Sequence, residues 1–304
     1  MTETPEQNQD DSEPKADHEV SRRPLSKTPM FAAMHSARYE RQELIKNINE
    51  TEKTHLICYV GGAKTEIDRD DAAYFVDLLH NVQPGEPVDL LLHTYGGDVD
   101  ACEKLVRLIL ARVGDGKHFR VIVPDLAKSA GTLMALAASE ILMSESSELG
   151  MIDPQFQMRD NQGNQFWHSV IAYLEAYEEH AAALRQNSKD PVALLALDHF
   201  DSKVVRKFQG IRDRVQVFAE DLLKRQGLRS SEISAKLMSL SRWKTHGQPI
   251  GHADATEIGL RIKYLAPDDE CWQRYWKLYC LQRMEIGENS KLVESSYVSQ
   301  VLGE

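Results

Sequence analysis

Two apolar runs that break at small residues and then become helical constrain the fold of this chain more than any other feature. The first reads "LLLHTYGGDVDACEKL" and the second "VIVPDLAKSAGTLMALAASE". In each, a strand-like apolar run is followed by residues whose apolar positions recur with helical spacing. Such strand-to-helix junctions are typical of folds in which parallel strands alternate with helices.

The same alternation continues on both sides of these junctions. A β-rich run, "THLICYVGG", and a helical run from Asp70 to His80 come before them, and "EILMSESSELGMID" adds a further strand after them. Runs such as Val88 to Leu92 are almost continuously apolar, which suits strands that are covered on both faces of a sheet. The sequence therefore predicts an α/β fold with a largely parallel sheet.

Composition along the chain divides it into four segments. Residues 1–28 are rich in Glu, Asp, Gln, Pro and Ser, and we expect them to be disordered because they cannot bury enough apolar surface. Residues 29–53 are expected to form an arm helix, residues 54–285 the α/β domain, and residues 286–304 a flexible tail. Within the domain, residues 168–241 are predicted to form a long helical excursion from the α/β core.

Charge and composition exclude several classes of function. The 304 residues carry a formal net charge of −11 without a basic stripe or tail, which argues against nucleic-acid binding. The longest uncharged run near the middle, Ser129 to Ser139, is far shorter than the roughly 20 apolar residues that span a bilayer. Four widely spaced cysteines without a C-x-x-C pair indicate reduced thiols. We expect a cytoplasmic protein without a cofactor, a metal or a membrane span.

The small residues at the two junctions have the chemical properties of an acyl-transfer site. Carboxyl ends of strands and the starts of the following helices gather at one edge of an α/β sheet. Ser129 lies where a helix should begin, and Ala130 and Gly131 let a substrate approach the backbone. Gly96-Gly97 can present N–H groups without a blocking Cβ atom. Taken singly, a serine is a common helix cap and Gly-Gly a common turn, but together they could form a nucleophile and an oxyanion hole.

On these residues the chain resembles the ClpP/crotonase superfamily, and most closely the serine dehydrogenase proteinase family, which is related to signal peptide peptidase A. The matching stretches are "YVGG", "LLLHTYGGDVDACEKL", "AKSAGTLMALAASEILMSESSELGMIDPQ" and "THGQPIGHADATEIGL". They cover roughly residues 54–154 and 243–265. The resemblance implies a ClpP/crotonase-like βαβ spiral core, with Ser129 as nucleophile, Gly97 and Ala130 as oxyanion donors, and Gly96 as the turn residue.

The identity of the general base stays open in the sequence. ClpP carries a histidine where this chain has Asp153, in "MIDPQ", and the serine dehydrogenase proteinase family shares that departure. Our first choice is His246, in "KTHGQPI", oriented by Asp153. Its alternative is a loop histidine with a local hydrogen bond. A lysine could act instead, as in the Ser-Lys pair of signal peptide peptidase A. The lysines considered are Lys128, which adjoins Ser129, and Lys189, Lys203 and Lys207 on the helical excursion.

Three further features have simpler structural explanations. His93, just before the Gly-Gly junction, is expected to be a buried histidine with a satisfied hydrogen bond. His168, a further candidate for the base, lies beside two aromatic residues and is more simply explained as a packed or surface residue. The acidic run Asp68 to Asp71 could suggest a metal site, but acids at a predicted helix start are explained by capping.

Three functions remain in competition. The first is a serine endopeptidase that cleaves peptides or unfolded proteins through an acyl-enzyme on Ser129. The second is a catalytically silent relative that binds peptide or serves assembly, as the missing histidine at position 153 allows. The third is acyl-CoA chemistry of the crotonase kind, which the serine at the helix start disfavours. The resemblance also implies a homo-oligomer, and because there is no P-loop, any ATP-driven step would need a separate partner.

Overall fold

The computed structural model describes residues 2, 27–114, 118–159 and 162–303. The segment expected to be disordered, residues 1–28, lies almost wholly outside these ranges. The chain divides into two compact units, residues 1–36 and 37–304. In the first unit, helix α1 (Pro29–Met34) begins after Thr28, whose hydroxyl accepts the N–H of Phe31, and it buries none of its side chains.

The expected single arm helix over residues 29–53 is instead two helices. The helical backbone is interrupted at His35, and helix α2 (Ser36–Glu52) follows. Ile45 and Ile48 of α2 are buried in the core of the second unit, so this helix packs on its own domain.

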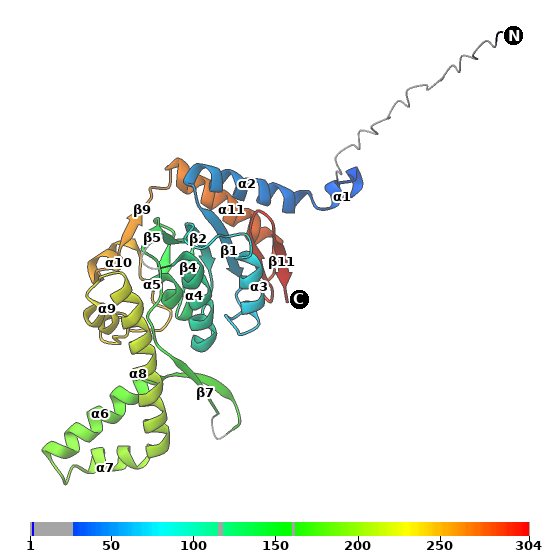
Figure 1. The fold of residues 1–304 in the computed structure, drawn as a ribbon. Coiled ribbons are helices and arrows are strands. Elements are labelled where there is room, and N and C mark those ends of the chain that lie inside the picture. Colours follow the sequence, from blue (N-terminus) through cyan, green and yellow to red (C-terminus); the bar gives the residue numbers. More distant parts are fainter. Residues whose placement is uncertain (1, 3–26, 115–117, 160–161, 304) are drawn as a thin grey trace. The chain divides into compact units, whose positions relative to one another are not determined.

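The second unit is built on a mostly parallel sheet (Figure 1). Among the described residues, this sheet has seven strands in the order β11-β10-β1-β2-β3-β5-β9. Strands β1, β2, β3, β5 and β9 run parallel, as the βα alternation predicts, and the predicted α/β fold is confirmed. The five parallel strands are His55–Gly61, Val88–His93, Phe119–Val123, Glu140–Met143 and Ile262–Tyr264.

Helices cover both faces of the sheet, as the continuously apolar strands predict. One face packs on α3 (Asp71–Leu78), α4 (Val99–Val113) and α5 (Ala130–Leu136), with α10 (His252–Ile258) at its end. The other face packs on α2 and on α11 (Glu270–Glu285). Alternate residues of β1, β2, β3 and β5 therefore enter two separate cores.

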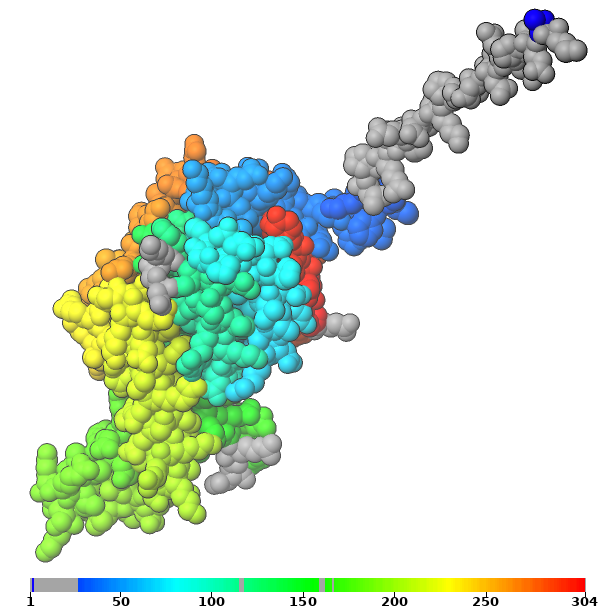
Figure 2. Space-filling model, viewed as in Figure 1, coloured from blue at the N-terminus to red at the C-terminus, as the bar shows by residue number. Residues whose placement is uncertain are grey.

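The helical excursion has a small core of its own. It consists of α6 (Val170–Gln186), α7 (Pro191–Asp198), α8 (Ser202–Arg225) and α9 (Ser230–Leu237). Val170, Leu174, Val205 and Phe208 are buried together between α6 and α8. Helix α8 contacts α6 along one part of its length and α5 and α9 along another. Figure 2 shows the excursion in green and yellow.

Two strand pairs of the structure were not predicted. An antiparallel hairpin, β7 (Gln155–Arg159) and β8 (Gln165–Ser169), leads into α6. The C-terminal segment expected to be flexible forms β10 (Lys291–Glu294) and β11 (Ser299–Leu302). Strand β10 pairs antiparallel with β1 and is buried throughout, so the prediction of a flexible tail from residue 286 is wrong. The apolar residues of β10 are buried because the strand pairs with β1, and the local sequence does not show this pairing.

Candidate functional site

The two strand-to-helix junctions meet beyond the carboxyl ends of β2 and β3. The short strand β4 (Leu126–Ala127) lies beside Thr94, whose N–H donates to Leu126 O at 3.0 Å and whose carbonyl accepts Lys128 N–H at 3.0 Å. This pairing brings Gly96 against Ser129. A Cβ atom added at Gly96 would lie only 2.9 Å from the Cβ of Ser129.

Ser129 has an unusual backbone conformation. Its φ of 50° and ψ of −112° are rare for a residue with a side chain, and such strain costs roughly 1–3 kcal/mol. The residue directly precedes α5, but its side chain makes no capping hydrogen bond. The helix-cap explanation of this serine therefore does not hold in the structure. The side chain is half-buried, which leaves it accessible to a substrate.

Gly97 is held tightly by Ile67. Ile67 N–H donates to Gly96 O at 2.7 Å, and Asp98 N–H donates to Ile67 O at 2.9 Å. A Cβ atom at Gly97 would lie 2.3 Å from Ile67 N, so only glycine fits, and its φ of 144° also favours glycine. Because both neighbours of Gly97 bond to Ile67, the Gly97 N–H points away from Ile67. No hydrogen bond within the described ranges uses the N–H of Gly97 or Ala130.

The start of α5 is tied to the segment that follows β5. Thr132 Oγ1 lies 2.8 Å from Ala127 O and 2.9 Å from Gly150 O, and it accepts Gly150 N–H at 3.0 Å. Strand β6 (Glu148–Leu149) pairs with β4 next to this contact. These bonds fix the backbone on both sides of Ser129.

Lys128, one of the candidate bases, is engaged on the same segment. Its Nζ lies 2.9 Å from Glu148 Oε1 and donates to Leu149 O at 3.2 Å. Both contacts are made to β6, so the ammonium is already engaged by a carboxylate and a carbonyl. The geometry therefore favours a structural role for Lys128.

His246 and Asp153 lie close together, with Gln155 between them. His246 Nδ1 is 3.5 Å from Asp153 Oδ2 and 3.2 Å from Gln155 Nε2. Gln155 Nε2 also donates to Asp153 Oδ2 at 2.6 Å, and Ser169 donates to Asp153 Oδ1 at 2.8 Å. Asp153 is almost fully buried, whereas about a third of the His246 side chain is exposed. In the described part of the chain, no hydrogen bond joins His246 to Ser129.

Which nitrogen of the neutral His246 ring carries the proton depends on the contacts of Gln155 and Asp153. The amide N–H of Gln155 points at Nδ1, which must then accept, so a neutral ring carries its proton on Nε2. A general base oriented by Asp153 needs the opposite tautomer, with Nδ1–H toward the carboxylate and a free Nε2 lone pair. The Gln155 side chain therefore decides which nitrogen of His246 can accept a proton.

The remaining candidates for the general base make no contact with Asp153 or Ser129 among the described residues' hydrogen bonds and ion pairs. Lys189, Lys203 and Lys207 are exposed on the helical excursion, and Lys207 lies 4.8 Å from the centre of the Phe156 ring. His168 lies on β8, opposite Phe156.

His93 is a buried histidine with one hydrogen-bonded nitrogen. Its Nδ1 lies 3.2 Å from the hydroxyl of Tyr279, which donates to Asp125 at 2.7 Å. Burial lowers the pKa of His93 to about 4; the carboxylate of Asp125 opposes this shift and Arg283 adds to it. Its Nε2 has no partner among the described atoms. The expectation of a satisfied core histidine is therefore met at only one of the two ring nitrogens.

The acidic run Asp68 to Asp71 serves the start of α3. Asp68 Oδ1 accepts the N–H groups of Asp70 at 2.8 Å and Asp71 at 3.3 Å. Asp71 itself is buried against Lys291. Within the described ranges, no three His, Cys, Asp or Glu side chains are arranged to hold a metal ion. Nor does any described helix combine the length and the apolar character needed to cross a bilayer.

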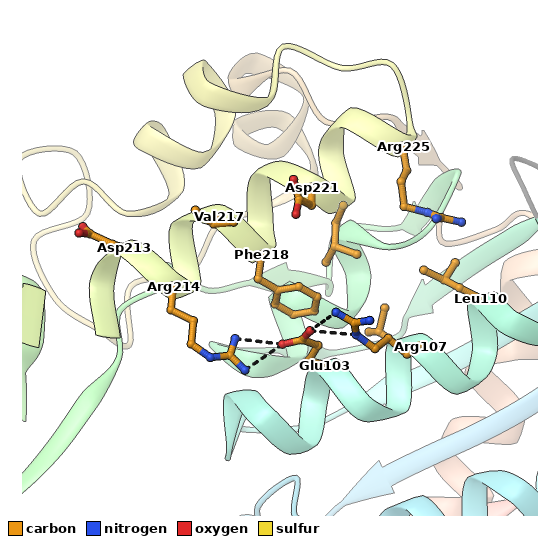
Figure 3. Close-up of a pocket in the computed structure, with 11 residues that line it drawn as sticks. Glu103, Arg107, Leu110, Asp213, Arg214, Val217, Phe218, Asp221 and Arg225 are labelled. Atoms are coloured by element: carbon orange, nitrogen blue, oxygen red, sulfur yellow. Dashed lines mark hydrogen bonds and ion pairs between the residues drawn. The ribbon is translucent and has the colours of Figure 1, made fainter. Parts of the chain in front are cut away.

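A separate groove of about 550 Å³ opens between α4 and α8 (Figure 3). Phe218 of α8 points toward α4, and Glu103 lies between Arg214 and Arg107. Glu103 accepts from Arg214 at 2.9 Å and from Arg107 Nε at 2.9 Å. Glu103 is therefore shared by two guanidinium groups, and neither Ser129 nor His246 lines the groove.

Sequence reasoning missed three residues of the site. Ile67 is a single apolar residue between two acids, and its pairing with Gly97 exists only in the folded chain. Gln155 belongs to "MIDPQ", but nothing local shows that it reaches His246. Ser169, which caps α6, also bonds to Asp153.

Comparisons with known proteins give a family and several distant similarities. Two uncharacterized proteins of Methanocaldococcus jannaschii are each 29% identical to the chain, over 201 and 182 residues. The aligned regions cover 66% and 60% of this chain, and the chain spans only 62% and 53% of the lengths of these relatives.

Two solved structures are also similar. Both are mutants of a 1510-N membrane-bound stomatin-specific protease, the second in complex with a substrate peptide. Their TM-scores are 0.46 and 0.41 at 14% and 13% identity. They cover 73% and 74% of this chain, which in turn covers 83% and 96% of theirs.

The family comparison is the most informative, because it spans both junctions. Residues 64–280, well over half of the chain, match the family described as ClpP-like SDH-type serine proteinase. The match begins before Gly96-Gly97 and ends after His246. The chain belongs to the family of ClpP-like SDH-type serine proteinases.

Proposed function

We propose that this protein is a serine endopeptidase that cleaves peptides or unfolded proteins through an acyl-enzyme on Ser129. The observation that carries the proposal is the strained, uncapped Ser129 beside Gly96 and next to two unused backbone N–H groups. Strained residues cluster at active sites, where the surrounding structure maintains them. Membership of a serine proteinase family supports the same reaction.

In the proposed reaction, Ser129 Oγ attacks the carbonyl carbon of the scissile peptide bond and loses its proton to a base. The carbonyl oxygen becomes an oxyanion that accepts hydrogen bonds from the N–H groups of Gly97 and Ala130. Collapse of this intermediate breaks the C–N bond, and the base returns the proton to the leaving amine. Water then releases the acyl group from Ser129 in a second attack of the same kind.

We propose His246 as the base and Asp153 as the residue that orients it. Their 3.5 Å separation supports this pairing. Catalysis then requires Nδ1–H to donate to Asp153, so the amide of Gln155 must turn away from Nδ1 when substrate binds. Replacement of Gln155 by alanine removes the competing donor and leaves His246 and Asp153 in place.

Hydrolysis of an unfolded protein substrate tests the proposal. Ser129→Ala should abolish cleavage, and His246→Ala should lower kcat by roughly 10²–10⁴-fold. His252→Ala is the matched control, because His252 lies on the same returning segment at the start of α10. Cleavage by purified Ser129→Ala at the wild-type rate would rule out this nucleophile, and full activity of His246→Ala would rule out this base.

One observation favours a second function, that of a catalytically silent peptide-binding or assembly protein. The Gln155 amide occupies the His246 nitrogen that a catalytic pair would use. If the protein is catalytically silent, wild type and Ser129→Ala should bind peptide with equal affinity, and neither should hydrolyse it. Turnover by wild type alone decides for the peptidase.

We also propose that the protein is a cytoplasmic homo-oligomer. Val192 and Leu195 of α7 are each 69% exposed, which suits a surface that a second copy covers.

Free thiols support the cytoplasmic compartment. They are typical of a reducing environment, and the structure has four of them, Cys58, Cys102, Cys271 and Cys280. Light scattering on the purified protein tests the oligomer, since a monomer at micromolar concentration would contradict it, and cell fractionation tests the compartment.

A further inference from the structure

A buried lysine near the C-terminus holds the turn that precedes α3. Lys291, on β10, is only 8% exposed. Its Nζ lies 2.6 Å from Asp71 Oδ1 and donates to Asp68 Oδ2 at 2.7 Å and to the carbonyl of Glu66 at 3.0 Å. The ammonium therefore makes two hydrogen bonds and a further ion pair, all with one short segment, residues 66–71. Lys291 lies outside the range 64–280 that matches the proteinase family.

The partner carboxylate Asp71 joins this segment to the sheet. Asp71 Oδ2 accepts the hydroxyl of Tyr59, on β1, at 2.9 Å and the N–H of Asp68 at 2.9 Å. Tyr59 and Asp71 are each 1% exposed, so water cannot replace these bonds. Burial alone would raise the pKa of Asp68, but its bonds to Lys291 and to two backbone N–H groups hold that pKa below its usual range. Burial raises the pKa of Asp71 in spite of its contact with Lys291, so the ion pair of the cluster is carried mainly by Lys291 and Asp68.

Ile67 lies between the two residues that Lys291 holds, and it is the residue that pairs with the Gly-Gly loop. Glu66 supplies a carbonyl and Asp68 a carboxylate to the lysine, while Ile67 bonds to Gly96 O and Asp98 N–H. The backbones of Ile67 and Gly97 are in close contact, because a Cβ atom added at Gly97 would lie only 2.3 Å from Ile67 N. Any movement of Ile67 therefore moves the backbone of Gly97.

We propose that Lys291 is a positioning residue: it fixes Glu66 and Asp68, and through Ile67 it aims the Gly97 N–H at the oxyanion. The inference rests on the proposed peptidase function, because the oxyanion forms only in that reaction. Lys291 touches no substrate. Oxyanion donors act only when they are within hydrogen-bond distance of the developing charge, so small displacements lower kcat rather than raise KM.

The main variant is Lys291→Met, which removes the ammonium and keeps most of the apolar stem. The matched control is Lys64→Met, because Lys64 joins the same turn to the same C-terminal segment through Glu288, with both side chains about two-thirds exposed. Lys291→Arg restores a cation. Asp68→Asn weakens one contact of the cluster and serves if Lys291→Met fails to fold, since the Asp68 side chain is half-exposed.

Two readouts separate the inference from the proposed function. The first is hydrogen exchange of the Asp98 amide, which reports its bond to Ile67 without any activity. The second is steady-state cleavage of peptide. We expect Lys291→Met to speed Asp98 exchange by about tenfold or more and to lower kcat by roughly 10-fold or more with KM within about twofold. Lys64→Met should match wild type in both readouts, and Lys291→Arg should recover part of kcat.

The outcomes are distinguishable. Unchanged Asp98 exchange in folded Lys291→Met, and in Asp68→Asn, overturns the inference whether or not the protein cleaves peptides. Faster exchange with unchanged kcat also overturns it, because Lys291 would then stabilise the turn without serving catalysis. If wild type cleaves nothing, the proposed function fails and the catalytic role of Lys291 fails with it. The exchange data would still show separately whether the lysine holds the loop.

Discussion

At the scale of single residues, the candidate site depends on backbone conformations that few residue types adopt. Ser129 has a positive φ although it carries a side chain, and Gly96 and Gly97 leave no room for a Cβ atom. The identities of these residues could be predicted as important from the sequence. Their conformations could not be predicted, because Gly96 and Gly97 are held by Ile67 and β4, which are distant from them in sequence, and Ser129 lies against Gly96.

Gly97→Ala is predicted to destabilise the protein and to abolish reaction at Ser129. The new Cβ would collide with the backbone of Ile67 and displace the N–H that we assign to the oxyanion hole. Gly85→Ala is the matched control, since Gly85 has a φ of 87° and no atom within 4 Å of an added Cβ. It should cost only about 1–2 kcal/mol of backbone strain. The measurements are the urea midpoint of unfolding and the labelling of Ser129 by a fluorophosphonate probe. Equal values of both in the two variants would contradict this account of Gly97.

His93 is predicted to make the protein sensitive to acid. Its folded pKa of about 4 lies below the unfolded value near 6.5. The unfolded chain therefore binds the proton first, and stability is lost as the pH falls from about 6.5 to 4. The loss should reach about 3 kcal/mol. Urea unfolding across this range should show a shallower loss in His93→Gln than in wild type. The exposed control His80→Gln should behave as wild type, and an unchanged pH slope in His93→Gln would refute the assignment.

At the scale of elements, helix α2 is attached to the sheet by a buried ion pair. Arg41 of α2 is 2% exposed, and its Nε donates to Glu294 of β10 at 3.0 Å while Nη1 donates to Glu285 of α11 at 2.7 Å. Glu294 is fully buried. The apolar edge of α2 could be predicted from Ile45 and Ile48, but a buried arginine could not, because its partners lie more than 240 residues away.

Arg41→Met is predicted to lower the free energy of unfolding by about 3–5 kcal/mol, because it leaves the Glu294 carboxylate buried without its cation. Adding Glu294→Gln should recover part of this loss. Lys46→Met, on the exposed side of the same helix, should stay within about 0.5 kcal/mol of wild type. Chemical unfolding of the four proteins measures the effect, and a loss below 1 kcal/mol in Arg41→Met would show that α2 is held by its apolar contacts alone.

The βα alternation could be predicted element by element, because period and apolar content are local properties. Helix α3, for instance, lies within the helical run from Asp70 to His80 that the sequence predicts. Strand β10 could not be predicted, since "KLVE" is too short and too charged to indicate a buried strand. Its burial comes from pairing with β1, and the buried Lys291 is accommodated because its ammonium contacts Asp68 and Asp71.

At the scale of the whole molecule, the site draws on segments from nearly the full length of the second unit. Ile67 pairs with the Gly96-Gly97 loop, Ser129 directly precedes α5, and Asp153 and His246 lie on either side of the helical excursion. The family match covers all of these but not β10, whose Lys291 contacts the segment around Ile67 from outside the matched range. The sequence resemblance therefore pointed to the residues that we propose as reacting groups, and the folded chain adds the contacts that hold them.

The most direct test of the central claim is intact-mass analysis after reaction with a fluorophosphonate probe. The probe phosphonylates only a serine that is activated and served by an oxyanion hole. We predict one adduct per chain on wild type and on the control Ser139→Ala, whose serine lies beyond the other end of α5, and none on Ser129→Ala. A folded wild type that takes up no adduct, or a Ser129→Ala protein that still takes one up, would contradict the assignment of Ser129 as the nucleophile.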